Sequence, residues 1–308
     1  MTDSLFRKMG APPIDVVRVT SAAPVRTEVT WDDRDVRLYH LALGAGVPET
    51  DDDELAYVYE RHARGLAVLP TFGTVAGGTG GIGFQVFDLP GVHLDLAQAL
   101  HGGQEITVHR PLPAAARATA VTHVPAVYDK GRAAVIVQES TLLDEDERPL
   151  LTQRNHIFVH GAGGFGGDRG PTDPTPVPDR APDHLFDLPT MRQQALLYRL
   201  TGDWNPLHAD PATARAAGYD RPILHGLCTF GMAVKAVTDR LLRSDPTRVT
   251  GCRTRFAGVF LPGETLRLHL WRHPDGDGDG DGDGYLLRAT APDRDDAVVL
   301  SHAAVTVR

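Results

Sequence analysis

A short polar stretch at residues 202–208, with the sequence Gly-Asp-Trp-Asn-Pro-Leu-His, holds the side chains best suited to acid–base chemistry. Asp203, Asn205 and His208 lie close together within it. A carboxylate, an amide and an imidazole can together hold one water molecule and move a proton to or from it. Aspartate and asparagine also cap turns without doing any chemistry. The spacing by itself therefore leaves two interpretations open, an acid–base site and a purely structural turn.

Helix signals that follow the stretch predict that it is a loop. Asp210 and Pro211 are a favourable N-cap and first helical residue, and Gly218 would end a short helix. Within the stretch itself, Gly202 and Pro206 are expected to fix the turns. The candidate side chains therefore lie on a loop directly before a helix.

A second, longer helix is predicted to begin at Gly226 and to end near Leu242. Its apolar residues recur three or four positions apart and form one stripe, namely Leu227, Phe230, Val234, Val237 and Leu241. The backbone N–H of Gly226 would lie at the positive end of the helix dipole, where it could stabilise negative charge on a substrate oxygen. His225 could cap this helix, line a pocket or only support the fold, and the supporting role is favoured.

A weak internal repeat divides the chain into two halves. Residues 38–41 (Leu-Tyr-His-Leu) match residues 197–200 (Leu-Tyr-Arg-Leu), and residues 141–159 align without a gap with residues 290–308. Between the halves, residues 161–182 are rich in glycine and proline and predict an exposed linker. The sequence therefore predicts an N-terminal domain at 1–160, a linker at 161–182 and a C-terminal domain at 183–308.

Each half is expected to contain one long helix followed by several strands. The expected strands cover residues 106–109, 117–123, 133–143 and 150–160 in the first half, and 251–260, 265–271, 285–290 and 298–307 in the second. Turns rich in Gly, Pro and Asp separate them, which favours antiparallel pairing. The pattern predicts an α+β fold.

Two other motifs suggest ligand sites that their context argues against. Residues 161–166 match Gly-x-Gly-x-x-Gly, but Pro171 follows too soon for the helix that a dinucleotide-binding loop requires. The alternating Asp-Gly run at 275–284 has no glutamate at the twelfth position of a calcium loop. We therefore expect a solvated hairpin turn there.

Composition excludes several classes of protein. The net charge is −9, from 31 Lys+Arg and 40 Asp+Glu, which argues against a protein that binds nucleic-acid phosphates. No apolar run reaches the roughly 18 residues of a membrane span, and the start lacks a secretory signal, so no membrane partner is expected. The two cysteines, Cys228 and Cys252, form no disulfide framework, which indicates a cytoplasmic location. No HExxH or CxxC arrangement occurs, so no metal and no cofactor are expected.

These motifs resemble a known family. Residues 202–231 closely resemble the signature of the type 2 enoyl-CoA hydratases, the MaoC-like dehydratase family, with its Gly-Asp-x-Asn-Pro-x-His core intact. Residues 57–78 and 100–113 are similar to the substrate-binding half of two-part members. The resemblance implies a double hot-dog fold, in which each half is a long helix packed in a curved antiparallel sheet.

The resemblance also implies an active site in the second half alone. Residues 43–49, which correspond to 202–208, lack the Asp, Asn and His. The first half would then be a degenerate hot-dog that has lost or shortened its helix and shapes an acyl pocket.

The implied reaction is the reversible hydration of trans-2-enoyl-CoA to (3R)-hydroxyacyl-CoA, a hydro-lyase activity. Asp203 and His208 would form the acid–base pair, Asn205 would orient the water and Gly226 would polarise the thioester carbonyl. The side chains and backbone expected beside the substrate are those of Tyr198, Gly202, Pro206 and His225, with Arg253 and Arg255 as candidates for the CoA phosphates.

Three alternatives remain at this point. The chain could dehydrate an acyl-carrier-protein or unusual CoA thioester, it could be a hot-dog thioesterase, or it could only bind acyl-CoA. The acidic net charge favours CoA over an acidic carrier protein. A homodimer is plausible, because hot-dog units commonly pair their sheets.

Overall fold

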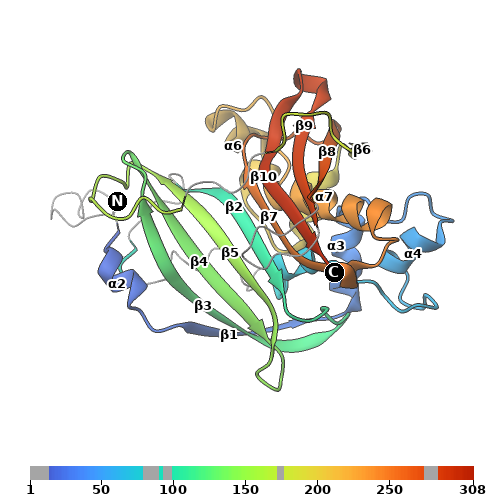
Figure 1. Cartoon of the computed structure of the whole chain (residues 1–308), viewed down its shortest axis with the longest axis horizontal. Coiled ribbons are helices and arrows are strands. Elements are labelled where there is room, and N and C mark those ends of the chain that lie inside the picture. Colours follow the sequence, from blue (N-terminus) through green and yellow to red (C-terminus); the bar gives the residue numbers. More distant parts are fainter. Residues whose placement is uncertain (1–13, 79–89, 93–98, 172–176, 274–283) are drawn as a thin grey trace.

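The protein is described by a computed structural model, which covers residues 14–78, 90–92, 99–171, 177–273 and 284–308. Its strands form one continuous antiparallel sheet in the order β1-β3-β4-β5-β2-β7-β10-β9-β8-β6 (Figure 1). The five strands of the first half are β1 (Val25–Trp31), β2 (Ala99–Val108), β3 (Ala116–Asp129), β4 (Ala133–Leu143) and β5 (Pro149–His160). Those of the second half are β6 (His184–Pro189), β7 (Val249–Phe256), β8 (Thr265–His273), β9 (Gly284–Ala291) and β10 (Ala297–Val307).

The two halves of the sheet have the same strand order when each is followed inward from its own edge. The first half runs β1-β3-β4-β5-β2 and the second runs β6-β8-β9-β10-β7. The innermost strands β2 and β7 pair antiparallel, with Ile106 opposite Cys252. Each of the eight predicted strands is confirmed, whereas the edge strands β1 and β6 were missed. Both edge strands carry few buried side chains, so they lack a strong apolar signal.

The predicted long helix of the second half is confirmed as α7 (Gly226–Leu241), which packs against β7 and β10. Eleven consecutive residues of α7 are buried, from Cys228 to Thr238. Figure 1 shows the helix beside the C-terminal strands. This extensive burial explains why an apolar stripe marks α7 so clearly in the sequence.

The expectation of a matching long helix in the first half is wrong for the described residues. Between α4 (Asp52–Val58) and β2, the part of the chain that the structure describes contains a short 3-10 turn, η1 (Pro70–Thr74), which touches α7. A side chain at Gly73 would force the Leu151 side chain to move, because its Cβ would lie 2.2 Å from Leu151 Cδ2. The glycines of this region disfavour a helix. This is compatible with the lost or shortened helix that the family resemblance implies for the first half.

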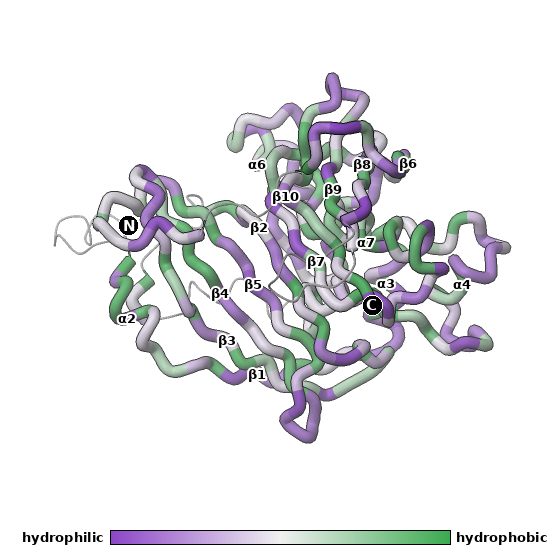
Figure 2. Tube along the Cα trace, viewed as in Figure 1, coloured by the Kyte–Doolittle hydropathy of each residue, from purple (hydrophilic) through white to green (hydrophobic). Residues whose placement is uncertain are grey.

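The remaining helical segments surround this framework. They are α2 (Val16–Thr20), α3 (Asp33–Ala42), α5 (Gln194–Tyr198), η5 (Arg199–Thr201), η6 (Pro206–His208), α6 (Pro211–Ala216), η7 (Pro246–Arg248) and η8 (Pro292–Arg294). Figure 2 shows hydrophilic and hydrophobic residues interspersed along the strands, and β3 alternates buried with more exposed positions over most of its length. This alternation is expected of a sheet with one covered and one solvated face.

The internal repeat brings its equivalent residues together in the core. Tyr39 of α3 and Tyr198 of α5 occupy matching positions of the repeat, and their ring centroids lie 6.0 Å apart. Both side chains are fully buried. Helices α3 and α5 therefore pack against each other, and α5 leads directly into η5 and the 202–208 loop.

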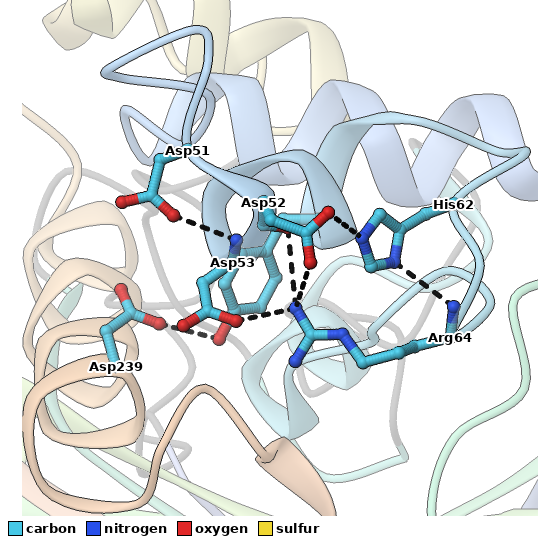
Figure 3. A network of polar contacts seen from close by, with 7 residues as sticks. Asp51, Asp52, Asp53, His62, Arg64 and Asp239 are labelled. Carbon is cyan, nitrogen blue, oxygen red and sulfur yellow. Dashed lines mark hydrogen bonds and ion pairs between the residues drawn. The ribbon is translucent and has the colours of Figure 1, made fainter.

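A network of polar contacts at the start of α4 anchors the first half against α7 (Figure 3). Asp51 caps α4 by accepting a hydrogen bond from the backbone N–H of Asp53, and His62 Nε2 lies 3.0 Å from Asp52 Oδ1. At the other side of the network, the Tyr57 hydroxyl donates to Asp239 Oδ1 of α7 at 2.7 Å. The network ties a helix of one half to the central helix of the other.

The glycine-rich stretch after β5 is exposed over most of its length but is fixed at one end. The backbone N–H groups of Gly131, Gly164 and Gly166 all donate to the Asp129 carboxylate, at 2.7 to 2.9 Å. These bonds lower the pKa of Asp129. The N–H groups of the Gly-x-Gly-x-x-Gly motif therefore bind a carboxylate of this chain, as expected for a structural loop. The acidic run at 275–284 lies almost wholly outside the described residues.

Candidate active site

The loop at residues 202–208 is shaped by local bonds that its sequence predicts. Gly202 has a φ of +124°, which favours glycine. Asp203 Oδ1 accepts from the N–H of Asn205 at 3.2 Å, and Asn205 Oδ1 accepts from the N–H of Leu207 at 3.0 Å. Pro206 begins η6. The turn-capping interpretation is thus correct for both side chains, and it is compatible with chemistry because each keeps further polar atoms.

His208 ends this loop with one ring nitrogen fixed. Its Nδ1 lies 2.9 Å from the carbonyl oxygen of Ile223. Because a carbonyl can only accept, Nδ1 carries the proton and Nε2 of the neutral ring has a free lone pair. Burial lowers the pKa of His208, while the negative charge of Asp203 and the bond to Ile223 oppose this effect. The ring is therefore held as a neutral imidazole that can accept a proton at Nε2.

His225 stacks directly on His208. The ring centroids lie 3.7 Å apart with an interplanar angle of 28°, and the Tyr198 ring follows at 4.8 Å from His225. His225 Nε2 lies 3.3 Å from the backbone oxygen of Asp203. Burial, with a smaller contribution from His208, lowers the pKa of His225 to about 2. His225 is thus a neutral support that joins the acid–base loop to the start of α7, in agreement with the favoured supporting role.

Gly226 is the first residue of α7, as predicted. The carbonyl of His225 accepts from the N–H groups of Cys228 and Thr229, so the N–H of Gly226 precedes the first bonded turn. A Cβ at Gly226 would lie 2.8 Å from Cδ1 of the Phe256 ring. The absence of a side chain therefore lets Phe256 of β7 cover the start of α7 closely.

Arg253 and Arg255 lie on β7. On this strand they alternate with Cys252 and Thr254, whose side chains are buried. Arg253 is opposite Glu105 of β2 and helps to lower the pKa of that carboxyl. Because side chains alternate between the faces of a strand, the two arginines lie on the face of β7 turned away from the core, and their role in binding the CoA phosphates stays a prediction.

One residue of the site, Arg199, was missed by sequence reasoning. Arg199 donates from Nη2 to the carbonyl oxygen of Trp204 at 3.3 Å, and its guanidinium lies 4.8 Å from the centroid of the Trp204 ring. The charge of Arg199 also lowers the pKa values of His208 and His225. Arg199 lies outside the 202–208 motif, and its only signal was its place in the repeat opposite His40.

Asp203, His208 and His225 together form a compact polar group. Their candidate ligand atoms all lie within 4.8 Å of one another. One water molecule could contact the Asp203 carboxylate and the His208 imidazole at this spacing. Three such side chains can also approach a cation, and the expectation that no metal is resident stays a prediction.

Both halves of the chain match known family models. Residues 29–161 match the MFE-2 hydratase 2 N-terminal domain, and residues 174–285 match the MaoC-like domain. The second match includes the acid–base loop and the start of α7.

A relative and two solved structures extend these matches to nearly the whole chain. The enoyl-CoA hydratase ChsH3 of Mycobacterium tuberculosis is 45% identical over 94% of this chain and 97% of its own length. The crystal structure of a MaoC-like dehydratase from Phytophthora capsici superposes with a TM-score of 0.81, at 27% identity over 95% of this chain and 98% of that one. A Mycobacterium tuberculosis protein with a double hot-dog fold gives a TM-score of 0.57 at 18% identity, covering 93% of this chain and 96% of that one, which shows the fold alone.

The fold expected from the family resemblance is therefore confirmed as an α+β double hot-dog. With its intact Gly-Asp-x-Asn-Pro-x-His loop, its two family domains in order and a relative that matches from end to end, the chain belongs to the MaoC-like dehydratase and hydratase 2 family and is a hydro-lyase.

Proposed function

We propose that this chain catalyses the reversible hydration of trans-2-enoyl-CoA to (3R)-hydroxyacyl-CoA. The observation that carries the proposal is the neutral His208 ring, with its Nε2 lone pair beside the Asp203 carboxylate at the start of α7. The Mycobacterium tuberculosis relative, named as an enoyl-CoA hydratase, supports the substrate class. The (3R) configuration rests on the family resemblance.

Each residue has one task in the proposed reaction. The Asp203–His208 pair holds the water and takes one of its protons as the oxygen bonds to C3 of the enoyl group. The electrons of the double bond move toward the thioester oxygen, which the N–H of Gly226 stabilises. The pair then delivers a proton to C2. Asp203 and His208 act as a coupled unit, so their titration belongs to the pair.

Asn205 and the supporting residues keep this geometry fixed. The Asn205 side chain shapes the loop through its bond to the N–H of Leu207, and its amide is proposed to orient the water. Tyr198 and His225 support the His208 ring as a stack. Gly202 and Pro206 set the turns on either side.

The proposal is tested by following the absorbance of the enoyl-thioester band with crotonyl-CoA and with a longer enoyl-CoA. Loss of the band together with formation of (3R)-hydroxyacyl-CoA supports it, and comparison of the two substrates ranks chain length. Release of free CoA thiol would instead indicate a thioesterase. Turnover of an acyl-carrier-protein thioester alone would indicate the carrier-dependent dehydratase, and binding without turnover an acyl-CoA-binding protein.

Gly226→Ala is expected to lower kcat for hydration by about 10²-fold or more, because the new methyl group meets the Phe256 ring and displaces the start of α7 from the carbonyl. The comparison is Gly226→Ala combined with Phe256→Leu, which gives the methyl group room and should recover part of the rate. A single variant that hydrates at the wild-type rate would rule out Gly226 as the donor to the thioester oxygen.

The location and assembly of the protein remain predictions. In the described part of the chain, no helix is both long and apolar enough to cross a membrane. The cytoplasmic location, the lack of nucleic-acid and membrane partners, and the homodimer stay predictions from the sequence. Light scattering of the purified protein tests the homodimer directly, since a mass near 33.3 kDa would exclude it.

A further inference from the structure

Arg199 holds Trp204 at two points. Its Nη2 donates to the Trp204 carbonyl oxygen at 3.3 Å, and its guanidinium lies 4.8 Å from the centroid of the indole ring. Trp204 stands between Asp203 and Asn205, the two residues that cap the loop. A side chain that fixes both the backbone and the ring of Trp204 therefore restricts the turn that carries the acid–base pair.

The position of Arg199 carries a cost in free energy. Arg199 is half-buried, and among the described residues its Nε has no hydrogen-bond partner. Burying a guanidinium nitrogen without a partner is unfavourable. A smaller neutral side chain would avoid that penalty, but it would lose both contacts with Trp204.

The internal repeat provides a comparison within the same chain. The position that matches Arg199 is His40, a fully buried ring held between the carbonyl oxygen of Tyr57 at 2.9 Å and the N–H of Leu69 at 3.3 Å. Burial lowers the pKa of His40 to about 3, so this ring is neutral. The half without an acid–base loop therefore uses a neutral residue where the half with the loop has a permanent positive charge.

The groups around His208 define what that charge does. Asp203 faces the ring with a negative charge, Ile223 contributes a carbonyl, and the neutral His225 ring stacks on it, with the Tyr198 ring tilted against His225. Arg199 is the cation that acts on both histidines, and it lowers the pKa of each. Like charge on a neighbour disfavours protonation of an imidazole.

We propose that Arg199 is a positioning residue of the 202–208 loop, which holds Trp204 so that Asp203 and His208 keep their reacting geometry. The inference rests on the proposed function, because it assigns Arg199 a task in that reaction. It adds a residue from outside the 202–208 motif to the machinery.

Two substitutions separate the contact of Arg199 with Trp204 from the effect of its charge. Arg199→Lys keeps the charge but loses the flat guanidinium that stacks on Trp204, so kcat should fall about tenfold or more while the acidic limb of the pH profile stays in place. Arg199→Gln loses the charge as well, so the acidic limb of kcat/KM should also move to higher pH. The matched control is Arg215→Gln on α6, an exposed arginine whose loss should leave both quantities unchanged.

Two measurements test the role of Arg199 without any turnover of substrate, and so independently of the proposed function. Trp204 is 49% exposed, whereas Trp31 and Trp271 are 4% and 2% exposed, so acrylamide quenching reports mainly on Trp204. Quenching should increase in both Arg199 variants, and an NMR titration of the His208 ring should shift upward in Arg199→Gln alone. If Arg199→Gln changes neither quenching nor the titration of His208, the inference is overturned. If the wild-type protein instead hydrates no enoyl-CoA, the proposed function fails while these two results still stand.

Discussion

His208→Asn is expected to lower kcat for hydration by about 10²-fold or more. The asparagine amide can still donate to the carbonyl of Ile223 in place of Nδ1, so the loop keeps its anchor while the Nε2 lone pair is lost. His208→Asn is therefore a more specific test of the Nε2 lone pair than His208→Ala, which would also leave a cavity under His225. Initial rates with crotonyl-CoA at saturating concentration measure the effect.

The pH dependence provides the matching control. Because burial lowers the pKa of His208, the wild-type ring should stay neutral below the ordinary histidine value of about 6.5. Wild-type kcat/KM should therefore fall only on the more acidic side of that value, and His208→Asn should lack this acidic limb.

Asp203→Asn should also lose at least about 10²-fold in kcat. Near wild-type rates in either variant would show that the acid–base pair lies elsewhere.

Lys235→Met is expected to destabilise the protein by about 3–5 kcal/mol. Lys235 of α7 donates to both oxygens of Glu54, at 2.8 and 2.9 Å, and to Asp239 Oδ2 at 2.7 Å. The side chain of Lys235 is 9% exposed and those of Glu54 and Asp239 are 18% exposed. Removing the lysine leaves two carboxylates close together in the interior. Burial already raises the pKa of Asp239, and the positive charge of Lys235 opposes that effect. Without Lys235, the ionised carboxylate of Asp239 becomes still less stable.

Urea unfolding measures this effect against two comparisons. Lys130→Met removes an exposed lysine, which bonds to the Arg169 carbonyl, and should change the free energy of unfolding little. Adding Glu54→Gln to Lys235→Met removes one of the stranded charges and should recover part of the loss. A Lys235→Met protein as stable as the wild type would mean that the ion pairs between α4 and α7 contribute nothing net.

The sequence alone determined most elements and identified the loop for which we propose acid–base chemistry. Period-two and period-3.6 patterns identified strands such as β8 and the helix α7, because the burial of a side chain there follows directly from its position in the element. The Gly202–His208 motif identified Asp203, Asn205 and His208, because the signals for a turn and for a helix start are local. The repeat indicated two related halves, which the matching strand orders of the sheet bear out.

Tertiary structure decided the contacts between different elements, which no local sequence pattern contains. The stacking of His225 on His208 joins segments on either side of α6, and the contact of Phe256 with Gly226 joins β7 to the start of α7. The direction of the Arg253 side chain depends on which face of β7 the core occupies, and the sequence interpretation of that arginine lacked this information. No local pattern marks Arg199 or Lys235 as part of a polar contact. Arg199 is five residues from Trp204, and the turn between them brings the two side chains together. Lys235 meets Glu54 only when the chain has folded, because α4 and α7 lie far apart in the sequence and their contact depends on the arrangement of the elements in space.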